Sequence, residues 1–326
     1  MRVLVTGSSG HLGEALVRTL QNNGHDVVGV DIAPSSFTHA AGSIADRDHV
    51  RACMQGVEAV LHTATLHKPH VATHSRQDFV DTNITGTLNL LEEAVTAGVR
   101  SFVFTSTTSV YGDAMAPAAG APAVWIDEEV VPSAKNIYGV TKIAAENLCQ
   151  LFHRNQKLPC LILRTSRFFP EADDDEETRE TYADANIKAI EYLYRRVALD
   201  DVVGAHLLAM ARAPDIGFDR YVISATTPFT RDDLAELHID AAAVLRRRVP
   251  GYEALFGKLG WKMLPHLDRV YDNARARTRL GWQPTFDFAH VLDRLREGGG
   301  LTTELAREIG IKGYHAGMFA NGRYPV

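Results

Sequence analysis

The 326-residue sequence has few cysteines, no long apolar run and no excess of positive charge. Its three cysteines, Cys53, Cys149 and Cys160, form no CxxC pair, which argues against a zinc knuckle and against a disulfide framework. No apolar segment has the length of a membrane-spanning helix, and a β-rich run beginning at Arg2 leaves no room for a signal peptide. We therefore expect a cytoplasmic protein that has no membrane partner.

Charge and histidine patterns argue against two further classes of partner. The formal net charge is -6, so no basic footprint for nucleic acid is expected. The acidic run Asp173–Glu177 lacks the interleaved glycines and carbonyl ligands of a hard-cation site, and we interpret it as a solvated loop. A group of histidines fits no single helix face and predicts substrate or loop contacts rather than zinc: His62, His67, His70 and His74. We expect no metal.

Short apolar runs alternate with amphipathic stretches through the first half of the chain. Strands that are apolar throughout and separated by helices predict an α/β fold with a Rossmann-type doubly wound parallel sheet. The predicted strands contain Val3–Val5, Val27–Val30, Ala59–Leu61, Phe102–Phe104 and Leu161–Leu163. The predicted helices contain Leu12–Gln21, Asn83–Ala97 and Ile143–Phe152.

This alternation weakens after about Phe168. Helices are expected near residues 184–194 and 201–213, a strand near 221–224, and a helix start at Thr230–Asp233. We predict a first, Rossmann domain over residues 1–167. Residues 168–326 would form mainly a smaller substrate lobe, with some segments returning to the first domain.

A glycine-rich turn joins the first strand to the first helix. Gly7 and Gly10 allow the backbone to turn and approach a pyrophosphate, and Gly13 allows close packing of helix and strand. The second strand ends in Asp31, placed to accept hydrogen bonds from a ribose and to repel a 2′-phosphate. This arrangement predicts NAD as the cofactor of the first domain. The same turn would contribute Ser9, His11 and Leu12 to the NAD site.

Tyr138 and Lys142 are four residues apart and share one face of a helix. An ammonium group near a tyrosine favours the phenolate, which can take the proton of a substrate hydroxyl while hydride leaves the same carbon. The strand upstream ends in a hydroxyl-rich segment, Thr105–Ser109, at the edge of a parallel sheet where ligands bind. The pattern predicts oxidation or reduction at a carbinol carbon.

Taken together, these motifs resemble those of the extended short-chain dehydrogenase/reductases, in particular the NAD-dependent epimerase/dehydratase family. Further similar segments are His62–Thr65, Asn83–Thr87, Val110–Gly112 and Leu280–Pro284. The resemblance implies a Rossmann domain with a small carboxyl-terminal lobe, a sugar-like small-molecule substrate, and a homodimer formed through two helices.

The resemblance also implies roles for individual residues. Thr107 would be the catalytic hydroxyl, Tyr138 the base, and Lys142 its partner and a contact of the nicotinamide ribose. Ser43 and Ile44 would lie near adenine. Three further residues would contact the cofactor: Ala64, Thr65 and Asn83.

The sequence departs from the family in its substrate half. Thr108 stands where sugar dehydratases carry an acid after the catalytic threonine, which disfavours dehydration. Arg167 stands where nucleotide-sugar epimerases carry an asparagine for the substrate diphosphate. That arginine could bind a phosphate or carboxylate of the substrate, or pair with the acidic run nearby. We assign Thr107, Thr108 and Arg167 to the substrate site.

Three functions are compatible with these residues. The leading hypothesis is an NAD-dependent epimerase of a sugar that carries a nucleotide or is free. The alternative is an NAD-dependent dehydrogenase of a free sugar, uronate or related alcohol, which the departure at Arg167 supports. A non-catalytic NAD sensor is disfavoured, because a sensor needs neither Thr107 nor Tyr138.

Overall fold

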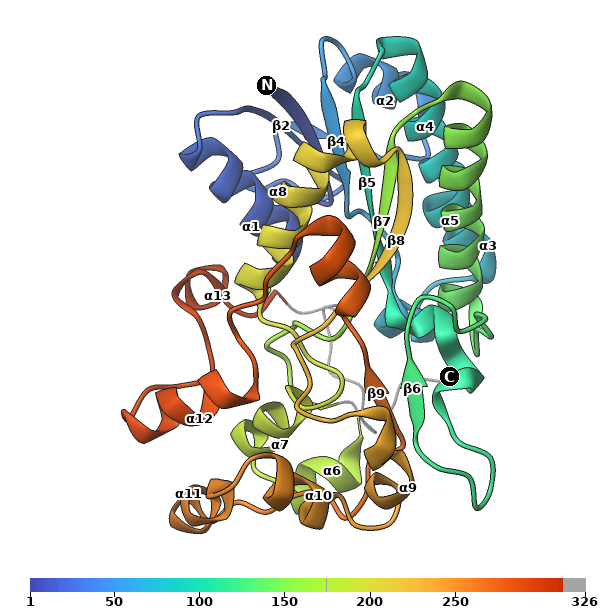
Figure 1. The fold of residues 1–326 in the computed structure, drawn as a ribbon. Helices are drawn as coiled ribbons and strands as arrows, with labels where there is room; N and C mark the ends of the chain where they lie inside the picture. Colours follow the sequence, from blue (N-terminus) through green and yellow to red (C-terminus); the bar gives the residue numbers. More distant parts are fainter. Residues whose placement is uncertain (174, 313–326) are drawn as a thin grey trace.

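The computed structural model describes residues 1–173 and 175–312, and a seven-stranded parallel sheet forms its centre (Figure 1). The strand order is β3-β2-β1-β4-β5-β7-β8, a doubly wound arrangement in which the order reverses beside β1. The strands of this sheet are β1 (Arg2–Thr6), β2 (Asp26–Asp31), β3 (Ala40–Ala41), β4 (Ala59–His62), β5 (Ser101–Thr107), β7 (Cys160–Thr165) and β8 (Phe218–Ile223).

Helices cover both faces of this sheet, as Figure 1 shows for α1 and α8 on one side and α4 and α5 on the other. The helices that pack in this region are α1 (His11–Asn22), α2 (Arg47–Cys53), α3 (Arg76–Phe79), α4 (Gly86–Ala97), α5 (Ile137–Gln156), α8 (Leu199–Ile216) and α13 (Glu304–Ile309). The remaining helices are α6 (Glu176–Thr181), α7 (Asp184–Glu191), α9 (Leu234–Leu237), α10 (Ala241–Arg248), α11 (Tyr252–Leu259) and α12 (Phe288–Arg296).

Alternate residues of each central strand enter different cores. Val3 and Val5 of β1 pack with α1 and α8, whereas Leu4 packs in the opposite core with α2, α4 and α5. All three side chains are buried, because both faces of a parallel sheet are covered. The five strands predicted from their apolar runs are confirmed as β1, β2, β4, β5 and β7.

One predicted helix begins as expected and another does not. α5 begins at Ile137, so Tyr138 and Lys142 lie in it as expected, and the Asn136 side chain caps it by accepting a hydrogen bond from the Gly139 N–H at 3.1 Å. α4 begins at Gly86 rather than at Asn83, because Val80–Thr85 form a π-helical turn before it. Tyr138 lies in the first turn of α5.

A second core lies beyond the carboxyl ends of the strands, at the bottom of Figure 1. It contains α7, α10, α11 and α12, together with the two-stranded sheet of β6 (Val124–Ile126) and β9 (Arg269–Tyr271). Segments from the second half of the chain also belong to the main sheet, since β8 pairs with β7 and α8 packs against β5 and β7. The expected helix start at Thr230 is present as a capping box with Asp233.

The acidic run differs from the solvated loop that was expected. Asp173 is buried and accepts a hydrogen bond from Arg195 at 2.7 Å, while Asp175 caps α6 through the Thr178 N–H. Asp174 and the tail at 313–326 lie outside the described residues. Among the helices that are described, none is long and apolar enough to cross a membrane.

Candidate active site

The glycine turn after β1 is too tightly packed for a side chain at its third glycine. A Cβ atom on Gly13 would lie 1.8 Å from the Gly7 carbonyl oxygen, and Gly7 itself has a φ of +74°. The Gly7 carbonyl also accepts a hydrogen bond from the Gly10 N–H at 3.0 Å. The turn therefore leaves bare backbone at the N-terminus of α1, which is the cradle that a dinucleotide pyrophosphate requires.

Asp31 lies beside this turn at the end of β2. Its carboxylate accepts hydrogen bonds from the Ser9 N–H at 3.0 Å and the Ala33 N–H at 2.9 Å, which fix its orientation. Across residues 1–173 and 175–312, no basic side chain forms an ion pair with Asp31. An uncompensated carboxylate at this position fits the ribose of NAD and repels the phosphate of NADP.

Ser43 and Ile44, predicted near adenine, follow the short strand β3. Ile44 is buried, and its side chain fills the space that a Cβ atom on Gly86 would need, since that atom would lie 2.6 Å from Ile44 Cγ1. Ser43 Oγ accepts a hydrogen bond from the Ala45 N–H. The structure thus explains Gly86 by the packing of α4 on Ile44, whereas the contact with adenine stays a prediction.

Asn83 is buried, and both ends of its amide bond to the protein. Its Oδ1 accepts from Thr65 Oγ1 and the Leu66 N–H, and its Nδ2 donates to the Leu66 carbonyl and to Thr141 Oγ1. Ala64 is held in the same segment by a hydrogen bond from its N–H to Thr6 Oγ1. Asn83 therefore fixes the backbone after β4 against α5, and direct contact with the cofactor stays a prediction for Ala64, Thr65 and Asn83.

The three predicted catalytic residues meet where β5 ends and α5 begins. Tyr138 is buried and lines the same cavity as Thr107, whose side chain lies close enough to lower the pKa of the tyrosine. Lys142 lies one turn further along α5, where its Nζ donates to the Thr105 carbonyl at 2.6 Å and lies 4.1 Å from the centre of the Phe104 ring. The end of β5 thus contacts both Tyr138 and Lys142.

Burial shifts the pKa values of this pair in opposite directions. It raises the pKa of Tyr138 to about 12, although the nearby Thr107 side chain opposes the change. It lowers the pKa of Lys142 to about 7, while the negative charge of Glu146 acts the other way. Both shifts disfavour the charged forms, so additional positive charge near Tyr138 is needed to favour its phenolate at neutral pH.

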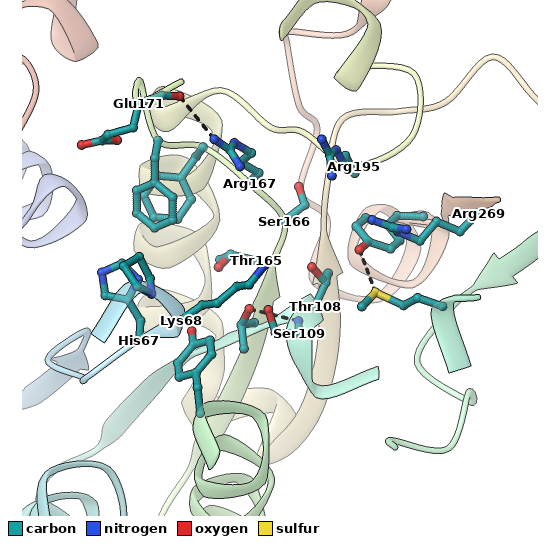
Figure 2. A pocket seen from close by; sticks show the side chains of 17 residues that line it. His67, Lys68, Thr108, Ser109, Thr165, Ser166, Arg167, Glu171, Arg195 and Arg269 are labelled. Atoms are coloured by element: carbon teal, nitrogen blue, oxygen red, sulfur yellow. Dashed lines mark hydrogen bonds between the residues drawn. The ribbon is translucent and has the colours of Figure 1, made fainter. Parts of the chain in front are cut away.

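A cavity of about 230 Å³ opens over Thr107 and Tyr138. Figure 2 shows Thr108 and Ser109 near its lower part, Arg167 and Arg195 above, and His67 on the side opposite Arg269. The lining is rich in hydroxyl and guanidinium groups that converge on one space. Such a cavity is suited to a small polar substrate whose carbinol carbon lies against Tyr138.

Arg167 lines the cavity, but its guanidinium group forms hydrogen bonds within its own loop. Its Nη2 donates to the Ala172 carbonyl at 2.7 Å and to the Glu171 carbonyl at 3.3 Å, and its Nε lies 3.9 Å from Glu191 (Figure 2). Arg167 thus contacts backbone carbonyls just before the acidic run and the acid Glu191, whereas both roles weighed for it, pairing with the acidic run and binding of substrate, stay predictions.

The loop after β7 also covers the glycine turn. Phe169 stacks on His67 with ring centres 5.6 Å apart and meets the edge of His11 at 5.7 Å. Glu171 approaches His11 at 3.1 Å, so the first residue of α1 has an acidic neighbour from this loop. Sequence reasoning missed Phe169, although two aromatic residues directly after a central strand could have indicated a cover for the site.

Sequence reasoning assigned no role to Ser166 or Arg269 and left Arg195 unplaced. Ser166 follows β7, Arg195 lies between α7 and α8, and Arg269 begins β9, yet all three line the same cavity. No spacing in the sequence relates these three residues. Their proximity depends on how the lobe packs on the sheet.

Fold and site together define an NAD-dependent oxidoreductase or isomerase of the extended short-chain dehydrogenase/reductase type. Residues 3–223 match the NAD dependent epimerase/dehydratase family, and the chain belongs to that family. Its cofactor is NAD.

Relatives of known name include both dehydrogenases and epimerases. The 3 beta-hydroxysteroid dehydrogenase/Delta 5-->4-isomerase of Mycobacterium tuberculosis is 26% identical over 336 residues, covering 89% of this chain and 88% of that protein. The UDP-glucose 4-epimerase of Erwinia amylovora is 29% identical over 182 residues, covering 50% of this chain and 52% of that protein.

Solved structures share the fold. A short-chain dehydrogenase/reductase superfamily protein from Agrobacterium tumefaciens with bound NAD has a TM-score of 0.65 at 24% identity, covering 90% of this chain and 95% of that one. The UDP-glucose 4-epimerase of Thermotoga maritima with UDP-glucose has a TM-score of 0.60 at 24% identity, covering 91% and 99%.

Proposed function

We propose that this chain oxidises a secondary alcohol of a sugar-sized substrate, with Tyr138 as the base that removes the hydroxyl proton. The observation that carries the proposal is that Thr107 and Tyr138 line one polar cavity, with Lys142 held on the Thr105 carbonyl of the same strand end. NAD, when bound along the glycine turn, supplies a hydride acceptor and a positive charge. Each remaining part of the reaction is assigned to a residue of the chain.

Thr107 and Tyr138 would share the substrate oxygen. The Thr107 hydroxyl donates to that oxygen and stabilises the charge that develops as its proton leaves. The Tyr138 oxygen would receive the proton as a phenolate, and the Lys142 ammonium would favour that phenolate before the transfer. Asp31 at the end of β2 and the glycine turn after β1 would hold the cofactor.

Two fates of the oxidised substrate separate a dehydrogenase from an epimerase. We favour release of the oxidised product, because a cavity of about 230 Å³ is smaller than the roughly 300–1,000 Å³ of sites for larger ligands, and a nucleotide-sugar is a larger ligand. The similarity to a dehydrogenase along nearly the whole chain supports the same choice. Epimerisation is the second candidate, favoured by the partial similarity to a UDP-glucose 4-epimerase.

The test is to incubate the protein and NAD with free hexoses, hexuronates and UDP-sugars while recording NADH absorbance and the NMR spectrum of the sugar. NADH formed in proportion to one substrate would establish a dehydrogenase, and an altered sugar without net NADH would establish an epimerase. An altered sugar without net NADH is therefore the result that would favour epimerisation over oxidation with product release.

Tyr138→Phe should lower kcat by about 1,000-fold, since the base is lost, and should leave the affinity for NAD unchanged. Tyr252→Phe is the matched control, because this hydroxyl lies in the lobe and donates to the Ala242 carbonyl at 3.5 Å. Full activity of Tyr138→Phe would contradict the proposed mechanism, whereas NAD binding by the wild-type protein without turnover of any substrate would leave NAD sensing as the explanation of the cofactor site.

A further inference from the structure

Arg269 presents a guanidinium group to the cavity without an acidic partner. It begins β9, lines the cavity, and lies over the ring of Tyr271 at 5.9 Å. Its Nε atom is buried and has no hydrogen-bond partner within residues 1–173 and 175–312. A buried N–H donor without a hydrogen-bond partner costs free energy. This Nε–H group could therefore donate a hydrogen bond to a ligand in the cavity.

Acidic side chains near Arg269 in sequence or beside its cavity contact other basic residues. Asp268, its neighbour in sequence, lies 3.2 Å from the His238 ring. Asp173 pairs with Arg195 at 2.7 Å, and Glu191 pairs with both Arg195 and Arg196. Burial would raise the pKa of Glu191, but Arg196, Arg195 and Arg167 lower it to about 2. Glu191 therefore stays ionised with its own arginines, and Arg269 is left for another anion.

Ser166 supplies a second unused donor to the same cavity. It follows β7 and is 3% exposed, and in Figure 2 it lies between Arg167 and Arg195, with Arg269 on the far side of Arg195. Its backbone N–H donates to the Ile223 carbonyl, whereas its hydroxyl has no partner in the described part of the chain. A buried hydroxyl and a guanidinium whose Nε is buried line one cavity, so a single ligand can satisfy both.

We propose that Arg269 and Ser166 form an anion subsite that binds a carboxylate on the substrate. The subsite rests on the proposed function, because it fixes the acid group while the carbinol carbon lies at Thr107 and Tyr138. A guanidinium matches a carboxylate with two parallel hydrogen bonds, and a hydroxyl can donate a further one. The substrate class is then a short hydroxy acid of the hexuronate type, which suits a cavity of about 230 Å³.

The charge of the lining supports an anionic ligand. Four cationic side chains line the cavity, Lys68, Arg167, Arg195 and Arg269, against one acid, Glu171. Asp173 and Glu191 lie against Arg195 and Arg167 from outside the lining, so Arg269 is the cavity arginine that forms no ion pair within the described residues. The subsite differs from a clamp at Arg167, whose guanidinium donates to the carbonyls of its own loop.

The test compares substrates that differ only in the acid group. With NAD present, kcat/KM is measured for a hexuronate, the corresponding neutral hexose and the hexose 6-phosphate. Arg269→Met should lower kcat/KM for the hexuronate by about 100-fold, because one partner of a buried charge pair is removed. It should not change kcat/KM for the neutral hexose. Arg269→Lys should recover part of the loss, since lysine keeps the charge but not the forked geometry.

Arg279→Met is the control for loss of one positive charge, because Arg279 is 65% exposed and pairs with Asp219 outside the cavity. Thermal unfolding of each variant, together with NAD titration, separates loss of the subsite from loss of the fold. Equal loss for acid and neutral substrates in folded Arg269→Met would overturn the subsite. A preference for the hexose 6-phosphate that disappears in Arg269→Met would overturn the carboxylate as the ligand.

Calorimetric titration of the NAD-bound protein with the hexuronate distinguishes this subsite from the proposed reaction. Binding that Arg269→Met abolishes, without turnover of any substrate, would support the subsite and contradict oxidation by Tyr138. Turnover of a neutral hexose that Arg269→Met leaves unchanged would support the reaction and overturn the subsite. If the protein neither binds the hexuronate nor turns over any substrate, both the subsite and the proposed reaction are wrong.

Discussion

Glu146 lies one helical turn after Lys142 on α5 and is buried behind the catalytic residues. Its carboxylate accepts hydrogen bonds from Ser106 Oγ at 2.5 Å and from Arg164 Nη2 at 2.7 Å. Ser106 and Arg164 belong to β5 and β7, so the carboxylate joins α5 to two neighbouring strands. Its negative charge also opposes the lowering of the Lys142 pKa by burial.

Glu146→Gln should lower the free energy of unfolding by about 3–5 kcal/mol, because Arg164 would remain buried without its counter-charge. Urea unfolding at pH 7 measures the change. Glu253→Gln removes a carboxylate that also holds an arginine, Arg246 at 2.8 Å, but on the surface, and should cause a far smaller loss. If both variants lose a similar free energy of unfolding, burial of the Glu146–Arg164 pair does not determine its contribution to stability.

Residues with a local sequence pattern were predictable, and residues brought together by lobe packing were not. Thr107 ends a strand, while Tyr138 and Lys142 share one helix face, so the sequence placed them near one another. Arg269 belongs to a three-residue strand, which is too short to show a hydrophobic pattern. That it has no acidic partner emerges only from the positions of the surrounding acids in the fold.

At the scale of elements, the turn between β1 and α1 depends on direct contact between backbone atoms. The calculated 1.8 Å between a Cβ atom on Gly13 and the Gly7 carbonyl oxygen means that α1 must move for any side chain to fit. The neighbouring atoms belong to the Gly7 backbone, which cannot move aside as the end of a flexible side chain could. The N-terminus of α1 would then move away from the cofactor cradle.

Gly13→Ala should weaken NAD binding by about 10-fold to 100-fold and destabilise the protein by about 1–3 kcal/mol, as overpacking of a tight contact does. Calorimetric NAD titration and urea unfolding measure the two effects. Gly204→Ala makes the same change within α8, where nothing lies within 4 Å of the added Cβ atom, and should stabilise the protein by about 1 kcal/mol. Unchanged NAD affinity in Gly13→Ala would show that the turn tolerates displacement of α1.

Helix boundaries near the site were predicted with mixed accuracy. The spacing of Tyr138 and Lys142 indicated a helix that opens at Tyr138, and α5 begins one residue earlier, at Ile137. Asn136 and its bond to the Gly139 N–H are the capping signal that fixes this start. The π-helical turn Val80–Thr85 displaces the start of α4 to Gly86.

At the scale of the whole molecule, the family resemblance predicts a homodimer formed through two helices. α4 and α5 pack side by side on one face of the sheet and expose Val95, Val140 and Leu151. Light scattering should therefore give the mass of two chains, and Leu151→Glu should reduce it to that of one. Ile239→Glu, at a 78% exposed position in the lobe, should leave the mass unchanged. A wild-type mass of one chain would refute the dimer.

The free energy of unfolding should decrease over two successive pH ranges as the pH is lowered, because buried groups titrate differently in the folded and unfolded chain. Burial lowers the pKa of His206 to about 4, from 6.5 in the unfolded chain, and His62 is shifted in the same direction. Between pH 6.5 and 4 the unfolded chain therefore binds more protons, and the folded state loses stability as the pH falls. Glu191 extends the loss from pH 4.5 to about 2, since its arginine partners keep it ionised in the folded protein.

Urea unfolding at successive pH values measures this slope, to which one such group contributes up to about 1.4 kcal/mol per pH unit. His206→Gln can keep the polar contacts of His206 with Thr105 and Val202 but cannot titrate, so the slope between pH 6.5 and 4.5 should decrease. His290→Gln, at an exposed position, should leave it unchanged. A slope that His206→Gln does not alter would mean that His206 is protonated alike in the folded and unfolded chain. The neutral histidine between α8 and β5 would then have no part in the acid sensitivity of the fold.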